Sequence, residues 1–199
     1  MGRPSVREKL LDAGVTALHQ RGYSACGVRE ITQAAGVPLG SFSNHFQSKE
    51  EFAARVLDRY MAALLDVAGQ TLRDQSRDPL QRLTAYFEAI GTIAEPLEWR
   101  FGCMLANLGL ELPAHSEMLR GRLAAAIADM TAPFSEVLAE AQRQGQVRAD
   151  VPSSDLAIVV LSAWHGALLR AKVERHGAVP DMLARALPLL LRSNASGPS

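Results

Sequence analysis

The sequence predicts an all-α protein of about nine helices. Apolar residues recur at the three- and four-residue spacing of helix faces along most of the chain. Alternating runs of β-branched residues are nearly absent, and no Asn-Gly or Asp-Gly hairpin turn occurs. Hydrophobic residues make up 48% of the 199 residues and charged residues 21%, a composition that favours a packed core over disorder.

The first two expected helices lead to a turn that contains glycine. One runs from about Pro4 to Gln20, and the next begins near Val28. Gly36 suits the left-handed residue that ends a helix, and Pro38 suits the first turn of another. The inward face of the second helix is predicted from helical spacing to consist of Val28, Ile31, Ala34 and Ala35.

The third helix, from about Leu39 to Phe46, is too short to serve as core. Only Phe42 and Phe46 face inward, so small and hydrogen-bonding side chains remain outside. Two helices joined by a short glycine-containing turn form a helix-turn-helix, whose second helix enters the major groove of DNA. The pattern therefore predicts a DNA-binding unit, with the motif at about residues 27–46.

Charge is distributed unevenly along the chain. The formal net charge is zero, yet the stretch through Lys49 holds six Lys/Arg residues against three acidic residues. This local excess is modest, but it has the sign that contact with phosphate requires.

Six further helices are expected after the motif, with their own start or stop signals. Ser48 and Glu51 form a capping box ahead of the fourth helix, and Asp78-Pro79 opens the fifth. Pro133 is expected to kink or break the seventh. The expected ranges are about 49–69, 80–94, 99–110, 116–144, 153–175 and 181–192.

Signals for export or membrane insertion are not found. Charged residues interrupt the N-terminus where a signal peptide would be apolar, and no run of 18 apolar residues occurs. Two cysteines are too few for a disulfide framework. We therefore expect a cytoplasmic protein without a membrane partner.

Several spaced elements occur in a fixed order between about Arg7 and Tyr60. They are Arg21-Gly22-Tyr23, Val28-Arg29-Glu30-Ile31, Ala35-Gly36-Val37, Gly40-Ser41-Phe42, His45-Phe46 and Ser48-Lys49-Glu50. In this order they resemble the TetR family of bacterial transcriptional regulators. The resemblance implies a DNA-binding domain at residues 1–49 and an effector-binding and dimerisation domain at 50–192 that includes a connecting helix. Residues 193–199 are rich in Ser, Gly and Pro, so we expect them to form a disordered tail.

The resemblance also implies a homodimer bound to a palindromic operator in double-stranded DNA, because one short helix reads only a few base pairs. This chain has Cys26-Gly27 where the family often has Thr-Thr, and Ser43 where it usually has Tyr. The remaining candidates must then supply more of the DNA contacts. The residues expected to position or read DNA are Arg29, Pro38, Leu39, Gly40, Ser41, Ser43, Asn44, His45 and Lys49.

Residues 102–108, Glu111 and residues 164–172 resemble a TetR subgroup that responds to electrophiles, unsaturated acids or oxidants. In that pattern Cys103 would be the sensing thiol, with Lys172 stabilising its thiolate. Cys103 can equally be an inert, buried small hydrophobe, since thiol reactivity needs cationic neighbours that lower the pKa. The alternative sensor is a noncovalent pocket for a lipophilic or acidic small molecule.

Aromatic residues and one histidine could line such an effector pocket. They are Trp99, Phe101, Trp164 and His165, together with Phe87, and each of them can also be plain core. Glu111 and His115 share a helical spacing, but Pro113 lies between them and a third metal ligand is not evident. We expect no metal, no cofactor and no enzymatic activity, because no catalytic motif is found.

The last two expected helices carry more apolar surface than one partner helix needs. The resemblance implies that such a pair forms the dimer interface. The apolar residues concerned are Leu156, Val159, Val160, Ala163, Ala167, Met182, Leu183, Leu187, Leu190 and Leu191. A more distant alternative makes the C-terminal helices an enzyme or a metal-binding bundle.

Overall fold

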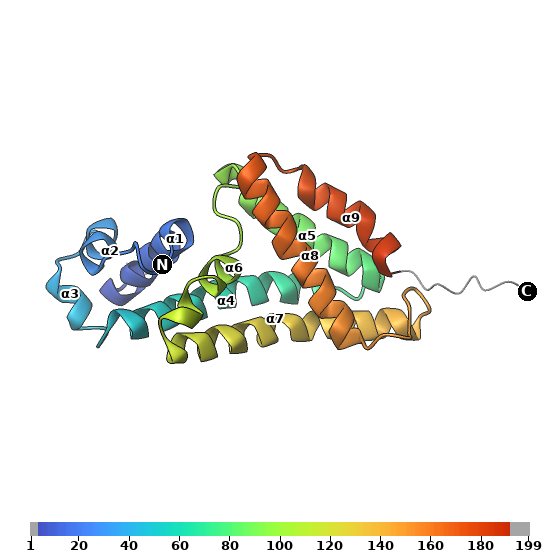
Figure 1. The fold of residues 1–199 in the computed structure, drawn as a ribbon, viewed down its shortest axis with the longest axis horizontal. Helices are drawn as coiled ribbons and strands as arrows, with labels where there is room; N and C mark the ends of the chain where they lie inside the picture. Colours follow the sequence, from blue (N-terminus) through green and yellow to red (C-terminus); the bar gives the residue numbers. More distant parts are fainter. Residues whose placement is uncertain (1–3, 192–199) are drawn as a thin grey trace, which may run out of the picture. The chain divides into compact units, whose positions relative to one another are not determined.

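The structure, a computed structural model, describes residues 4–191 and is helical throughout, with no strand in that range. Figure 1 shows its helices in chain order. This confirms the predicted all-α fold with nine α-helices among the described residues, joined by two short 3₁₀ turns, η1 and η2. The elements are α1 (Val6–Arg21), α2 (Val28–Ala34), α3 (Gly40–Ser43), α4 (Lys49–Leu72), α5 (Pro79–Ala94), η1 (Glu95–Leu97), α6 (Met104–Gly109), η2 (Leu112–Ala114), α7 (Glu117–Arg143), α8 (Ser153–Glu174) and α9 (Ala178–Leu191).

The chain packs into two compact units. The first contains the residues up to Ala63 together with Cys103–Ile127, and the second contains Leu64–Gly102 and the chain from Ala128 onward. Their boundaries differ from the functional boundary expected between residues 49 and 50. Helices α4 and α7 each contribute one part to each unit, so a packing unit does not correspond to a single continuous stretch.

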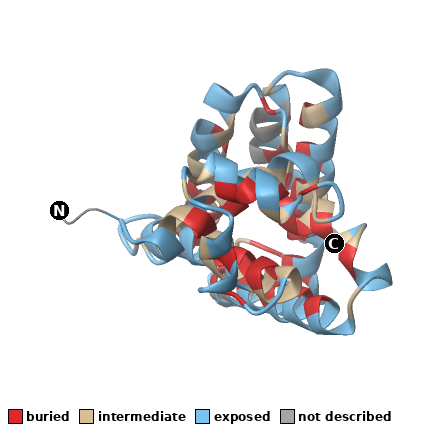
Figure 2. Cartoon of the chain, turned by 90° about the vertical axis from the view of Figure 1, so that its left-hand side faces the viewer, coloured by how far each residue is buried: buried red, intermediate tan, exposed pale blue. Residues whose placement is uncertain are grey.

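Close contact between α1 and α4 builds the core of the first unit. A Cβ atom placed on Gly14 would lie 2.4 Å from Cζ of Phe52 and 2.6 Å from Cγ2 of Val56, so only glycine allows this approach. Leu10 and Leu18, one turn to either side on α1, are fully buried. Figure 2 shows such buried residues in red on the inward faces of the helices.

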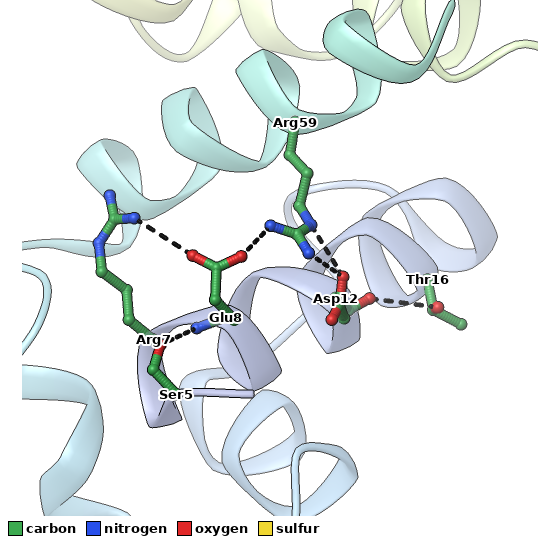
Figure 3. Close-up of polar contacts among 6 residues, drawn as sticks. All are labelled: Ser5, Arg7, Glu8, Asp12, Thr16 and Arg59. Carbon is green, nitrogen blue, oxygen red and sulfur yellow. Dashed lines mark hydrogen bonds and ion pairs between the residues drawn. The ribbon is translucent and has the colours of Figure 1, made fainter. Parts of the chain in front are cut away.

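A polar cluster on the same pair of helices supplements this apolar contact (Figure 3). Arg59 of α4 donates from Nε to Asp12 of α1 over 2.8 Å, and its other guanidinium nitrogens pair with Glu8 and Asp12. Ser5 caps α1 by accepting from the amide of Glu8. These contacts fix the direction of α1 against the first part of α4.

The aromatic core of the second unit gathers side chains from α5, α7 and α8. The ring of Phe87 lies 4.6 Å from that of Trp164 and 5.7 Å from that of Phe134. Tyr86 meets Phe134 edge-on at 4.9 Å. Such edge-on and tilted pairs are favourable beyond the area they bury.

One charged side chain is buried in the second unit. Arg82 of α5 is only 2% exposed, donates to the backbone carbonyl of Leu72 at 3.2 Å and pairs with Glu140 of α7 at 2.6 Å. Leu72 is the last residue of α4, where backbone carbonyls lack helical partners. The guanidinium therefore caps α4 and ties its end to α5 and α7.

Several expected helix limits need correction. The helix expected from about residue 99 begins only at Met104, because Glu98, Trp99 and Gly102 take left-handed backbone conformations with φ of 51°, 57° and 65°. Pro133 lies inside α7 without breaking it, and the helix continues to Arg143, close to the expected end at about residue 144. The last helix begins at Ala178, three residues earlier than expected. The tail predicted to be disordered lies outside the described residues.

Candidate DNA-binding face and sensing segment

The turn between α2 and α3 has the predicted geometry. Gly36 is left-handed, with φ of 63°, and the amide of Val37 donates to the carbonyl of Thr32 over 3.0 Å. Leu39 and Asn44, on either side of α3, also have helical backbone angles. The helix-turn-helix is therefore present, with a second helix, Gly40–Ser43, that is shorter than the expected range of about Leu39 to Phe46.

A cluster of three phenylalanines lies on the buried side of α3. The ring centroids of Phe42, Phe46 and Phe52 lie 4.9–5.5 Å apart. Because Phe42 and Phe46 are buried as predicted, the opposite side of the helix is left to solvent. This side carries six exposed DNA-contact candidates and the half-buried Ser41; the six are Pro38, Leu39, Gly40, Ser43, Asn44 and His45.

The inward face of α2 differs in one detail from the prediction. Ala34 is exposed, whereas Thr32 is buried and donates its hydroxyl to the carbonyl of Arg29 at 3.0 Å. This backbone bond satisfies the polar group and lets threonine occupy an inward position. The Arg29 side chain, on α2 within the motif, is exposed, as a DNA contact requires.

Lys49 begins α4 and lies against an aromatic ring. Its Nζ is 4.3 Å from the ring centroid of Tyr23, a favourable cation–π distance. The preceding Ser48 caps the helix by accepting from the amide of Glu51 at 3.0 Å. The Glu51 carboxylate accepts from Gln47 rather than from Ser48, so the predicted capping box is displaced by one residue. Tyr23 was named in a family motif but was not among the residues expected to contact DNA.

Cys103 immediately precedes α6 and belongs to the first unit. Its side chain is buried, and this burial raises the pKa of the thiol, while hydrogen bonds from the amides of Ala106 and Leu105 only partly offset the effect. The next residue, Met104, donates its amide to the Tyr60 hydroxyl of α4 at 3.4 Å. Cys103 is therefore a protonated thiol at neutral pH in this conformation.

The other sensing candidates belong to the second unit. Trp164 is buried in the aromatic core, and Trp99 packs on Gly177, where an added Cβ would lie 2.5 Å from the indole nitrogen. His165 is half-buried, and its burial lowers the pKa, which favours the neutral ring. Phe101 and Lys172 are half-buried as well. The pairing of Lys172 with Cys103 stays a prediction.

Helices α8 and α9 pack on each other and leave apolar side chains in solvent. Leu156, Val160 and Ala167 of the predicted set are buried inside the unit, whereas Val159 is 57% exposed. Five exposed residues of α8 recur every three or four positions and form one stripe: Val159, Ser162, Gly166, Leu169 and Val173. Ile158 is exposed as well. On α9 the exposed apolar residues are Met182, Leu189 and Leu190.

Two protein families match this chain. Residues 10–56 match the family described as "Bacterial regulatory proteins, tetR family", and residues 79–187 match "Tetracyclin repressor-like, C-terminal domain". The second match alone covers more than half of the chain. The chain belongs to the TetR family. It is accordingly a DNA-binding transcriptional regulator, and the families and relatives that it matches are regulators rather than enzymes.

Individual TetR relatives support the same conclusion. The "HTH-type transcriptional repressor DhaR" of Mycobacterium sp. strain GP1 is 39% identical over 88% of this chain and 87% of its own length. The "Transcriptional regulator AcuR" of Cereibacter sphaeroides is 35% identical over 84% and 76%. Among solved structures, a regulatory protein TetR from Rhodobacter sphaeroides has a TM-score of 0.88, with 30% identity over 94% of this chain and 98% of its own.

Helix α8 is long and apolar enough to cross a membrane by length and composition, with a mean hydropathy of 1.4. In this TetR chain 44% of its most apolar window is buried inside the protein. Length and composition alone are weak evidence for a membrane span, because a helix that packs partly against the rest of a protein passes the same test.

Proposed function

We propose that the protein is a homodimeric repressor that binds a palindromic operator and is released from it by a signal sensed in its C-terminal half. The exposed face of α3, held outward by Phe42 and Phe46, carries this proposal, because it presents hydrogen-bonding groups on a helix of major-groove size. DhaR and NemR, both named repressors, support repression over activation. We place the protein in the cytoplasm, where its operator would be.

The proposed dimer forms through α8 and α9. Its support is the exposed stripe on α8, in which the small residues Ser162 and Gly166 lie between larger apolar ones. Nothing lies within 4 Å of a Cβ atom placed on Gly166, so a second helix can approach closely there. In a two-fold dimer the same stripe meets its own copy, and two α3 helices then read two half-sites.

Lys49 and Asn44 are expected to contribute differently to operator binding. Lys49→Ala removes a charge aimed at phosphate, so it should weaken binding to all duplexes alike and lower the salt dependence by about one unit per lost contact. Asn44→Ala should instead relax preference at one base pair, costing about 1–3 kcal/mol only on the best sites. Selection of bound duplexes from a random library, followed by titration at several salt concentrations, measures both effects.

The Lys49→Ala and Asn44→Ala variants serve as controls for each other, because one is expected to affect all duplexes and the other only the preferred ones. If both variants lose affinity equally on specific and random duplexes, Asn44 does not read bases. If wild-type protein shows no sequence preference at moderate salt, the proposed repressor function is wrong.

We also propose that Cys103 is the point at which an electrophile acts. Its place directly before α6 supports this, since a group added to the buried thiol cannot be accommodated without displacing the helix. One solved relative, NemR of Escherichia coli, is described in its reduced form; it is 26% identical over 96% of this chain, with a TM-score of 0.80. The raised pKa of the thiol favours the second candidate, a noncovalent pocket in the C-terminal half.

Cys103→Ser separates these two candidates. With N-ethylmaleimide as the probe, wild-type protein is expected to lose most operator binding, whereas Cys103→Ser should retain it, because the hydroxyl is not alkylated. Cys26→Ser is the matched control, since Cys26 is also buried and burial also raises its pKa. Gel shifts after timed alkylation give the measurement. Equal release of Cys103→Ser and wild type would assign sensing to another residue or to a pocket.

A further inference from the structure

A carboxylate from the middle of the chain accepts hydrogen bonds from the backbone of the turn that follows α1. Glu111, between α6 and η2, accepts from the backbone amide of Tyr23 at 2.8 Å and from that of Ser24 at 2.6 Å. Gly22 completes the site with φ of 79°, and a Cβ atom placed there would lie 2.6 Å from Oε2 of Glu111. The turn thus combines two amide donors with the space that one carboxylate fills.

The electrostatics match this geometry. Burial opposes ionisation of Glu111, but hydrogen bonds from Ser24 and Tyr23 outweigh it and lower the pKa of the carboxyl group. The group is therefore an anion at neutral pH, and hydrogen bonds to an anion are shorter and stronger than neutral ones. Because the pKa is lowered on folding, this contact is retained above the ordinary glutamate range and is lost as the pH falls through the folded value.

Tyr23 links this contact to the DNA-binding face. Its backbone is held by Glu111, and its ring lies under Lys49 Nζ. The neighbouring Glu50, also in the first turn of α4, accepts from the hydroxyl of Ser116, which caps α7. Two residues of the segment Cys103–Ile127, Glu111 and Ser116, thus bind Tyr23 and Glu50, the two neighbours of the predicted phosphate-binding Lys49.

The same segment carries the proposed sensing cysteine at its other end. Helix α6 is six residues long and lies between Cys103 and Glu111. Only Leu110 separates the end of α6 from Glu111, so a displacement of α6 at Cys103 would reach Glu111 over a short stretch of backbone.

From these observations we propose that Glu111 is a positioning residue for DNA binding. It fixes the turn at Tyr23 and thereby the ring on which Lys49 rests, and withdrawal of Glu111 is the step by which a signal at α6 lowers operator affinity. The inference rests on the proposed repressor function for its biological meaning. The contact itself exists independently of what the signal is.

Glu111→Gln tests the inference, with Glu117→Gln as the matched control. Glu117 lies in the same segment, is exposed and bonds only Arg120 among the contacts described. Both variants remove one negative charge, which alone would strengthen DNA binding. Glutamine can accept one amide but meets the other with its own N–H groups. We expect Glu111→Gln to weaken binding to the best library-selected duplex about tenfold, and Glu117→Gln not to weaken it.

The salt dependence distinguishes positioning from general structural damage. Glu111→Gln should reduce the slope of affinity against salt as Lys49→Ala does, and the double variant should show little further loss, because both remove the same phosphate contact. If the affinity losses of Glu111→Gln and Lys49→Ala add fully in the double variant, the inference is overturned. It is also overturned if Glu111→Gln lowers affinity without changing the slope of affinity against salt.

Amide hydrogen exchange gives a readout that needs no DNA. Glu111→Gln should accelerate exchange at Tyr23 and Ser24 by at least tenfold while leaving the buried amides of α2 unchanged. Unchanged exchange at these two amides would refute the anchoring contact. If wild-type protein binds no duplex selectively, the repressor function fails, and the exchange experiment still decides whether Glu111 anchors the turn.

Discussion

Leu169→Glu is expected to convert the proposed dimer to monomers and to weaken operator binding by about 100-fold or more. Leu169 is 59% exposed and lies within the apolar stripe of α8, between Gly166 and Val173. In a two-fold dimer the substitution is present in both subunits, so it places two carboxylates in one apolar interface, where unpaired charges are costly. Sedimentation velocity measures the association state, and titration of the selected duplex measures affinity.

The loss of affinity follows from geometry rather than from damage to the reading helix. A monomer binds one half-site, whereas in a dimer binding of the first half-site raises the effective concentration at the second. Ile93→Glu is the control, because Ile93 is 56% exposed on α5, outside the proposed interface. A Leu169→Glu protein that stays dimeric at low micromolar concentration would show that another surface associates.

Arg82→Ala is expected to lower the free energy of unfolding by about 2–3 kcal/mol. The substitution leaves the carbonyl of Leu72 without its donor and opens a cavity where a fully buried side chain had packed. Arg82→Met should cost less, since its unbranched side chain fills much of the same volume. Urea unfolding monitored by circular dichroism gives the comparison.

The appropriate control is Arg143→Ala, on the same turn of α7 as Glu140 but exposed to solvent. Its removal should change stability by less than about 0.5 kcal/mol. If Arg82→Ala and Arg143→Ala lower the free energy of unfolding equally, Arg82 stabilises the fold only through its positive charge and not through its buried contacts. Nε of Arg82 is buried and has no hydrogen-bond partner among the described residues, a cost that offsets part of what its other contacts contribute.

The helix-turn-helix was predictable because its signals are local. Gly36 in the turn and the pair Phe42 and Phe46 act within a few residues of their own positions, and each has the expected conformation or burial. The region around Trp99 was not predictable in the same way. Its apolar residues are compatible with a helix, but consecutive left-handed residues break the backbone there, and nothing in the apolar spacing reveals this.

The contacts around the candidate site were less accessible to sequence reasoning. Glu111 was named in the subgroup resemblance and weighed as a metal ligand, but its partners were missed because they are backbone amides 88 and 87 positions away. Backbone groups have no sequence signature, so a side chain that binds them cannot be paired from composition or spacing. Arg82 escaped notice for a similar reason, since one of its two acceptors is the carbonyl that ends α4.

The interleaving of the two compact units limits how this regulator can be recombined with its relatives. A chimera joined once at residue 63 would take its operator specificity from one parent but would inherit Cys103–Ile127 from the other. The turn at Tyr23 would then meet a foreign partner in place of its own Glu111. Exchange of DNA-binding specificity between such proteins therefore calls for two transplanted segments, or for changes confined to the surface of α3.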